Sequence, residues 1–354
     1  MSPRFSVLDL VPVSRDQSSG QAIESSLRLA QLADAIGYER YWFAEHHNSL
    51  AGASATPAVT IAAALGRTKR IRLGAGGVML PNHSPLIVAE QFAALEAIAP
   101  GRIDLGLGRA PGSDRVIAQI LLYSGPTSDP AKFPESVSKI VQALQPGGAM
   151  IHLAATETYE IHATARATSA PPVWVLGGSE GSAALAASLG LPYAFAGHFG
   201  ATNPRQIIDM YRSRFRPSDH WRDPYALITA NVSVAATREE AEMRAVPQLL
   251  HLAGLRLGHR PEPMHTVESA RAALRRDESR IERQLVAQMR STWLGGTGED
   301  VADALDALVR ESGADEVMLH SIAGRREGDP LDLSVGRAQT LELIAKELGV
   351  RVSG

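Results

Sequence analysis

Apolar residues along the chain follow two alternating spacings, one typical of buried strands and one typical of helices. Residues 21–36 place apolar side chains three to four positions apart and are followed by Gly37, which is typical of a helix that ends in a left-handed cap. Short runs of branched and aromatic residues lie on either side, as in buried strands. We predict strands at 5–11, 41–44, 71–79, 102–108, 173–176, 192–196, 225–234 and 316–320, and helices at 21–36, 57–65, 86–98, 182–189, 203–215, 238–250, 301–311 and 331–348.

Strands that alternate with helices predict an α/β fold with a parallel sheet. Eight strands are enough to close a TIM (β/α)8 barrel, although an open doubly wound sheet has the same alternation. Polar motifs follow several successive strands, at 45–47, 109 and 179–182. A barrel would gather these motifs around one mouth, whereas an open sheet would spread them along an edge. The sequence therefore favours the barrel.

Two stretches interrupt the alternation and are interpreted as insertions in a single domain that spans residues 1–354. The first, at about 122–170, is rich in proline and threonine and contains a helical pattern at 135–144. The second, at about 251–290, is highly charged, and its residues 267–289 are predicted to be helical. We expect substrate specificity to reside in these two insertions.

The composition excludes several classes of partner. The 354 residues carry a net charge of -3, so there is no excess of basic residues to hold a nucleic acid backbone. No apolar run reaches the roughly 18 residues that a membrane span needs, and no signal peptide is recognisable. The chain contains no cysteine, which excludes disulfides and thiolate chemistry. A cytoplasmic location is the expectation that follows.

The segment from Tyr41 to His47 changes abruptly from strand-forming aromatic residues to three groups that can bind ligands or move protons. Glu45, His46 and His47 fall where a parallel strand delivers its side chains into the loop beyond it. The pattern indicates a functional site. Ordinary hydrogen-bonded or solvated histidines at a loop edge are the alternative.

Three glycines interrupt the third predicted strand, within Gly74-Ala75-Gly76-Gly77. Glycine costs stability in a strand, so either a flat ligand lies against this segment, or it forms a bulge or approaches a neighbouring strand closely. Arg109 follows the fourth strand, where a guanidinium could bind a phosphate through two parallel hydrogen bonds. A surface ion pair between Arg109 and Asp114 is the alternative for this arginine.

The segment Gly177-Gly178-Ser179-Glu180-Gly181-Ser182 joins a predicted strand to a predicted helix. Small residues at a helix N-terminus expose backbone N–H groups, and the helix dipole favours an anion there, so the segment is a candidate phosphate site. The serines would also serve as plain helix caps.

Hydrolytic chemistry is disfavoured by the motifs. The side chains of His46 and His47 point to opposite sides of an extended segment, so the two cannot easily share one metal ion. The chain has no His-Glu-x-x-His helix and no Gly-x-Ser-x-Gly elbow. We therefore predict no metal site.

Taken together, three motifs resemble the bacterial luciferase-like monooxygenase family, in its branch of single-chain flavin-dependent oxidoreductases. The motifs are Trp42-Phe43-Ala44-Glu45-His46-His47, the segment from Gly74 to Pro85, and Gly101-Arg102-Ile103-Asp104-Leu105-Gly106-Leu107-Gly108-Arg109-Ala110-Pro111-Gly112. The resemblance implies a TIM barrel that uses reduced FMN, supplied by a separate flavin reductase, and O2. A C4a-hydroperoxyflavin would then oxidise a small organic substrate. A homodimer is also implied.

The same resemblance implies roles for individual residues. His46 matches the catalytic histidine beside the flavin ring, and its neighbour His47 is expected to be catalytic with it, while Glu45 is expected to contact the cofactor. Gly76 and Gly77 match a strand position whose non-proline cis peptide supports the ring. Residues that match the phosphate site are Arg109, Gly178, Ser179, Glu180, Gly181 and Ser182.

Two alternatives keep the barrel but change its activity. The first is an oxidoreductase that uses the deazaflavin F420 for hydride transfer without oxygen. The second is a flavin-binding protein that has lost its chemistry.

Overall fold

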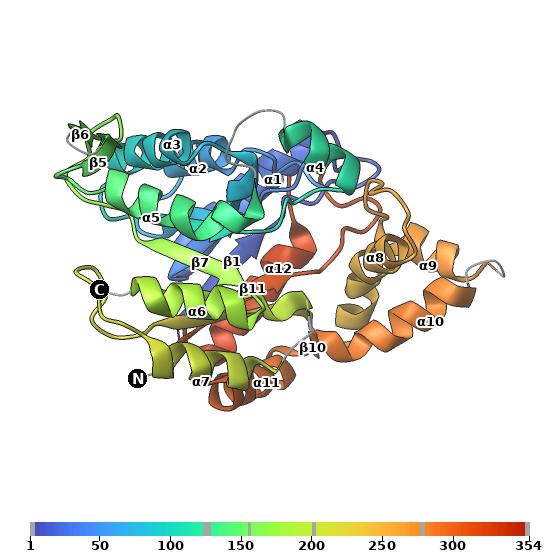
Figure 1. Ribbon diagram of the computed structural model, residues 1–354. Coiled ribbons are helices and arrows are strands. Elements are labelled where there is room, and N and C mark those ends of the chain that lie inside the picture. Colours follow the sequence, from blue (N-terminus) through green and yellow to red (C-terminus); the bar gives the residue numbers. More distant parts are fainter. Residues whose placement is uncertain (1–3, 123–128, 155–156, 200–202, 277–279, 351–354) are drawn as a thin grey trace.

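Eight parallel strands close into a barrel in the computed structural model, which describes residues 4–122, 129–154, 157–199, 203–276 and 280–350 (Figure 1). Around the barrel each strand pairs with the next, and β9 closes the ring by pairing with both β8 and β11. The TIM barrel with insertions is confirmed. Its strands, in spatial order, are β11 (Glu316–Ser321), β1 (Arg4–Asp9), β2 (Arg40–Phe43), β3 (Arg72–Met79), β4 (Ile103–Gly108), β7 (Val173–Gly177), β8 (Tyr193–Phe195) and β9 (Ala226–Val234).

Helices between the strands cover the outside of the barrel. Several begin at a side-chain cap: Ser18 accepts the N–H of Gln21 at the start of α1, which ends at Gly37 in the left-handed conformation. None of the helices in the described residues has the length and apolar character needed to cross a membrane. The helices that follow barrel strands are α1 (Ser19–Ile36), α2 (Pro57–Leu65), α3 (Pro85–Ile98), α4 (Arg115–Leu122), α6 (Glu180–Leu189), α7 (Pro204–Arg214), α8 (Arg238–Arg256) and α12 (Val335–Leu348), and α11 (Gly298–Ser312) precedes β11.

The apolar core has two layers. The larger layer lies between the strands and the surrounding helices and includes Tyr41, Phe43 and Phe92. The smaller fills the barrel interior, where Trp42 and Trp174 meet edge to face with ring centroids 5.2 Å apart. The interior of the barrel is therefore a packed core rather than a channel, and ligands are confined to its mouth.

Charged residues also lie inside the barrel, at the N-terminal ends of its strands. Arg40 on β2 donates from Nε and Nη2 to the two oxygens of Glu316 on β11, at 2.7 and 3.0 Å, and from Nη1 to Asp104 on β4 at 2.9 Å. All three side chains are buried. Burial alone would raise the pKa of Asp104, but Arg40 and Arg72 outweigh burial and hold this pKa below its ordinary value. One guanidinium thus links three strands of the barrel.

The two predicted insertions contain more structure than the sequence indicated. The first holds α5 (Phe133–Ala143) and an antiparallel hairpin of β5 (Ala149–Ala154) and β6 (Glu157–Ile161), which was not predicted. In the second, α8 continues through Arg256, and the single helix predicted at 267–289 is two helices, α9 (Val267–Leu274) and α10 (Arg280–Met289). A short strand, β10 (Leu294–Gly296), was also missed; it pairs beside the C-terminal end of β9. In Figure 1 the hairpin and α8–α10 lie at opposite ends of the barrel.

Replacement of Arg40 by methionine is expected to lower the free energy of unfolding by about 3–5 kcal/mol, because two buried carboxylates would lose their common cation. Chemical denaturation monitored by circular dichroism measures this change. The matched control is Arg205→Met, which breaks the exposed pair between Arg205 and Asp209 and should change stability little. Equal effects of the two substitutions would show that the buried network does not stabilise the barrel.

Candidate active site

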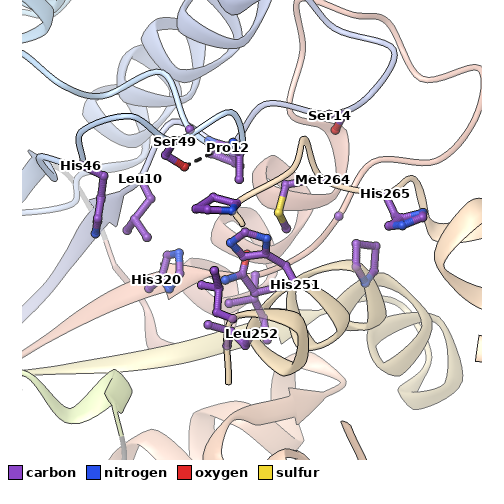
Figure 2. Close-up of a pocket in the computed structure, with 18 of the residues that line it drawn as sticks. Leu10, Pro12, Ser14, His46, Ser49, His251, Leu252, Met264, His265 and His320 are labelled. Carbon is purple, nitrogen blue, oxygen red and sulfur yellow. Dashed lines mark hydrogen bonds between the residues drawn. The ribbon is translucent and has the colours of Figure 1, made fainter. Parts of the chain in front are cut away.

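A cavity of about 550 Å³ opens at the C-terminal ends of the barrel strands. It lies between the ends of β1, β2 and β11 on one side and α8 with the segment that follows it on the other. Its walls are mainly apolar, with Leu10, Leu252, Met264 and Ile322 among them. Figure 2 shows the imidazoles of His46, His251 and His320 in the same walls. The cavity has the position expected of an active site in this fold.

His46 reaches this cavity from the loop after β2. Its backbone N–H donates to the carbonyl of Ser54 at 2.8 Å, and the next N–H, that of His47, donates to Gly112 at 2.9 Å, so the segment is held on both sides. The His46 ring has no hydrogen-bond partner among the described residues. Burial lowers the pKa of His46, an effect that nearby Glu45 partly opposes. The cavity therefore presents a neutral imidazole that is available to a ligand.

Three more histidines lie around His46. The pKa of His251, on α8, is lowered mainly by burial and to a smaller extent by His46. His198 follows β8, and burial lowers its pKa to about 4; its Nδ1 lies 2.5 Å from Oγ1 of Thr229. Burial lowers the pKa of His320 to about 3, and its Nδ1 lies 2.8 Å from Oδ1 of Asn231. All four imidazoles are uncharged at neutral pH and so exert no strong attraction on an ionic substrate.

The second insertion supplies one wall of the cavity, through residues such as His251, Leu255, Met264 and His265. Among the described residues, none of the first insertion lines it. A second cavity of about 330 Å³ also borders α8, and four side chains line both cavities: Gln248, Leu252, Leu255 and Ile322. The specificity predicted for both insertions therefore has a structural counterpart in the second one alone.

Glu45 does not line the cavity. Its side chain is buried and accepts hydrogen bonds from His47 and His83, whose Nε2 atoms each lie 2.7 Å from Oε1. The other oxygen, Oε2, accepts the backbone N–H of Met79 at 3.1 Å. Burial would raise the pKa of Glu45, but the two histidines outweigh it and bring the pKa to about 2. His83, which lies within the Gly74–Pro85 motif but was given no role of its own, is thus part of this group.

The peptide bond between Gly76 and Gly77 is cis, as the family resemblance implies. The pairing of β3 with β4 shifts register between Ala75 and Val78, so the glycines form a bulge. They also lie very close to other groups: a Cβ on Gly77 would lie 2.8 Å from the carbonyl oxygen of Gly106, and one on Gly74 would lie 2.6 Å from Nε1 of Trp42. The bulge and the close packing account for the glycines in this strand. They were the alternative to a flat ligand in the sequence analysis. Contact of Gly76 and Gly77 with a cofactor stays a prediction.

The predicted phosphate ligands follow two paired strands, β4 and β7, but they lie outside the cavity. Arg109 is exposed and has no hydrogen-bond partner among the described residues. The alternative pairing with Asp114 is not observed, because Asp114 accepts the N–H groups of Val116 and Ile117 at the start of α4.

Ser179 is the N-cap of α6, and it forms a reciprocal capping box with Ser182. The serines therefore act as helix caps, which was the alternative weighed for them. Glu180 and Gly181 begin the helix and are exposed. Gly178 is half-buried between β7 and the helix. Because the first N–H groups of a helix have no acceptor within it, this end of α6 can still receive an anion.

Sequence reasoning missed several residues of the cavity, namely His251, Met264, His265 and His320. One signal could have found His320, because it lies at the C-terminal end of the last strand, where catalytic residues of this fold gather. His198 carries a similar signal, three residues after β8. The residues of the second insertion carry no such signal, since no strand precedes them.

Comparison with known proteins identifies the class to which this barrel belongs. Residues 3–316 match the family model described as luciferase-like monooxygenase. A luciferase-like monooxygenase of Escherichia coli K12 is 39% identical over 319 residues, which cover 89% of this chain and 90% of that protein. The N-acetyl-S-alkylcysteine monooxygenase of Bacillus subtilis is 31% identical and covers 86% of this chain and 88% of its own. The chain therefore belongs to the luciferase-like monooxygenase family, whose members are oxidoreductases.

Solved structures agree with the fold. The crystal structure of apo-MsnO8 superposes with a TM-score of 0.85 at 27% identity and covers 99% of this chain and all of its own. The oxygenating constituent of 3,6-diketocamphane monooxygenase from Pseudomonas putida, solved with FMN, has a TM-score of 0.68 at 19% identity. An F420-dependent secondary alcohol dehydrogenase has a TM-score of 0.65 at 15% identity. The last two establish only that this barrel is shared by proteins that bind either cofactor.

Gly106→Ala is expected to destabilise the protein by about 1–3 kcal/mol or more, because the new Cβ would collide with the carbonyl oxygen of Ala75 inside the barrel. Thermal and urea denaturation measure the loss. Gly147→Ala is the matched control: its Cβ would meet no atom within 4 Å, and stability should change by no more than about 0.5 kcal/mol. If Gly106→Ala were as stable as the control, packing would not be the reason for glycine here.

Proposed function

We propose that this protein is a flavin-dependent monooxygenase that uses reduced FMN and O2 to oxidise a small organic molecule. One observation carries the proposal: the ring of His46 reaches a mainly apolar cavity at the barrel mouth and has no hydrogen-bond partner among the described residues, next to the strand that carries Gly76 and Gly77. Membership of the luciferase-like monooxygenase family supports the same class of reaction.

The residues around the barrel mouth fit FMN. A phosphate needs N–H donors and a cation. The start of α6, after β7, offers the N–H donors, and Arg109, after the neighbouring strand β4, offers the cation. His46 and the cis bond belong to β2 and β3, the next two strands around the barrel. An elongated cofactor with a flat ring and a phosphate tail would thus meet four successive strand ends.

Reduced FMN, when bound, supplies the two electrons that let one oxygen atom of O2 enter the substrate while the other leaves as water. The protein's part is to keep bulk water out and to handle protons. The apolar walls of the cavity do the first. The neutral ring of His46 does the second, because it can donate a hydrogen bond from one nitrogen and accept a proton at the other.

The cavity limits the substrate. A volume of about 550 Å³ admits a molecule of modest size. The walls are mainly apolar, and their charged side chains are already engaged: Arg325 pairs with Asp16, Arg337 pairs with Asp9, and Asp114 caps α4. This lining favours a substrate without net charge. His251, Leu252 and Met264 would contact it from the second insertion. An uncharged sulfur- or carbonyl-containing compound fits this description better than a phosphorylated one.

Arg109→Ala is expected to weaken FMN binding by at least about tenfold, because a charge-assisted hydrogen bond to phosphate would be lost. Fluorescence titration with FMN, and with F420 in parallel, measures the change. The control is Arg214→Ala, which removes an exposed arginine from α7 and should leave both affinities unchanged. Equal FMN affinities of wild type and Arg109→Ala would contradict the phosphate site, and tighter binding of F420 than FMN would favour the deazaflavin alternative.

His46→Gln is expected to slow substrate oxidation by about 10²–10⁴-fold while FMN affinity is retained, since only proton transfer is removed. A screen of uncharged sulfides, ketones and aldehydes, coupled to a supplied flavin reductase, provides the substrate, and product formation is then followed by mass spectrometry. His220→Gln, an exposed histidine outside the cavity, is the control. Wild-type protein that binds FMN but yields no product and no extra oxygen consumption would be a flavin-binding protein without chemistry.

A homodimer, a transient flavin reductase partner and a cytoplasmic location stay predictions. Large apolar side chains lie exposed on α2 and α3, where a second copy could cover them: Val59, Leu86, Ile87 and Ile98.

A further inference from the structure

Glu45, His47 and His83 form a cluster that the proposed monooxygenase reaction does not use. Two imidazole Nε2 atoms and one carboxylate oxygen of these residues lie within 4.8 Å of one another. In the part of the chain that the structure describes, no other group of three histidine or acidic side chains brings its ligand atoms so close together. The expectation of no metal site rested on His46 and His47, which point apart, and it overlooked this set.

Alternation along an extended segment explains how the three ligands meet. Glu45 and His47 are two residues apart and project to the same side, where Nε2 of His47 lies 2.7 Å from Oε1 of Glu45. The ring of His46 between them takes no part in this contact, and both His46 and His47 line the cavity. His83 arrives from the loop between β3 and α3, and β3 is the direct neighbour of β2 in the barrel. The cluster is therefore built from two adjacent strand ends, and through His47 it borders the cavity that His46 lines.

The backbone around the three ligands is already held in place. The N–H groups of His46 and His47 donate to Ser54 and Gly112, and that of His83 donates to Leu80 at 3.0 Å. Oε2 of Glu45 is occupied by the N–H of Met79, which leaves Oε1 to face both imidazoles. A ligand carboxylate whose second oxygen is bound by the protein is typical of a metal site, because this outer contact fixes the ligand's orientation.

We propose that Glu45, His47 and His83 bind one divalent transition-metal ion of the Zn²⁺ class. Two histidines and one carboxylate are an established donor set for Zn²⁺ and for the neighbouring first-row ions. The ion takes the place of the two protons that now lie between the imidazoles and Oε1, each ring moving its proton to Nδ1. Tetrahedral metal–ligand bonds of about 2.0–2.2 Å place neighbouring donor atoms about 3.3–3.6 Å apart, so the present 2.7 Å separations must widen by roughly 0.6–0.9 Å.

Solvent can reach the site, and its position gives it a structural role. The side chains of His47 and His83 are 17% and 31% exposed, so an ion can enter and a water molecule can complete its coordination. A bound ion ties the loop after β2 to the loop after β3, and thereby fixes the segment that carries His46. The proposal does not depend on flavin and can be tested without it.

Titration of chelator-treated protein with Zn²⁺ tests the site directly. Isothermal titration calorimetry should give one ion per chain, Zn²⁺ should raise the melting temperature, and Co²⁺ should develop the visible bands of a low-coordinate site. His83→Gln and Glu45→Gln should each weaken Zn²⁺ binding at least about tenfold and abolish the thermal shift. His83→Gln changes a partly exposed loop residue, so it keeps the test decisive if Glu45→Gln does not fold.

His162→Gln is the matched control. It removes a histidine that lies 3.1 Å from the carboxylate of Glu160 but has no third ligand, and it should bind Zn²⁺ like the wild type. Wild-type protein with no saturable Zn²⁺ site would overturn the proposal, as would unchanged affinity in His83→Gln. In either case the cluster would be a set of hydrogen bonds only, and the proposed monooxygenase would be unaffected.

Discussion

The buried guanidinium of Arg40 is the interaction on which the geometry of the barrel depends. Three charged side chains inside a low-dielectric core are tolerated only when they are paired closely, and Arg40 meets this condition by bonding Glu316 through two nitrogens and Asp104 through a third. The strands β2, β4 and β11 are therefore fixed relative to one another at their N-terminal ends. The opposite ends can then carry loops whose residues are chosen for chemistry rather than for stability.

At those opposite ends, three consecutive residues have different contacts. The ring of His46 lines the cavity with no hydrogen-bond partner among the described residues, whereas Glu45 and His47 bond within a cluster with His83, and His47 also lines the cavity. The position of the His46 ring thus depends on contacts that its two sequence neighbours make. The order of the cluster of Glu45, His47 and His83 and the position of His46 are linked through the backbone that they share.

The fold was predictable because its signal is local. Each barrel strand is a short apolar run and each covering helix has its own periodic pattern, so the alternation could be read without knowledge of contacts. The hairpin of β5 and β6 was missed because the side chains of β6 are nearly all exposed and polar, which leaves no buried face to detect. The strand β10 was missed for a different reason: Leu-Gly-Gly has little strand propensity, and its pairing is set by β9.

The site was predictable only in part. His46 could be found because it directly follows a strand, but the partner of Glu45 lies 38 residues away and is brought near by the pairing of β2 with β3. For the glycines of β3, the sequence identified the residues but not the reason for them. Their close packing against Trp42 and Gly106 depends on the three-dimensional structure. Long-range contacts of this kind leave no mark on spacing or composition.

A few side chains line both cavities beside α8, chiefly Leu252 and Leu255 from the helix and Ile322 directly after β11. Substitution of a few residues on one face of α8 could therefore join the two cavities or separate them. The barrel strands and the position of His46 would stay as they are.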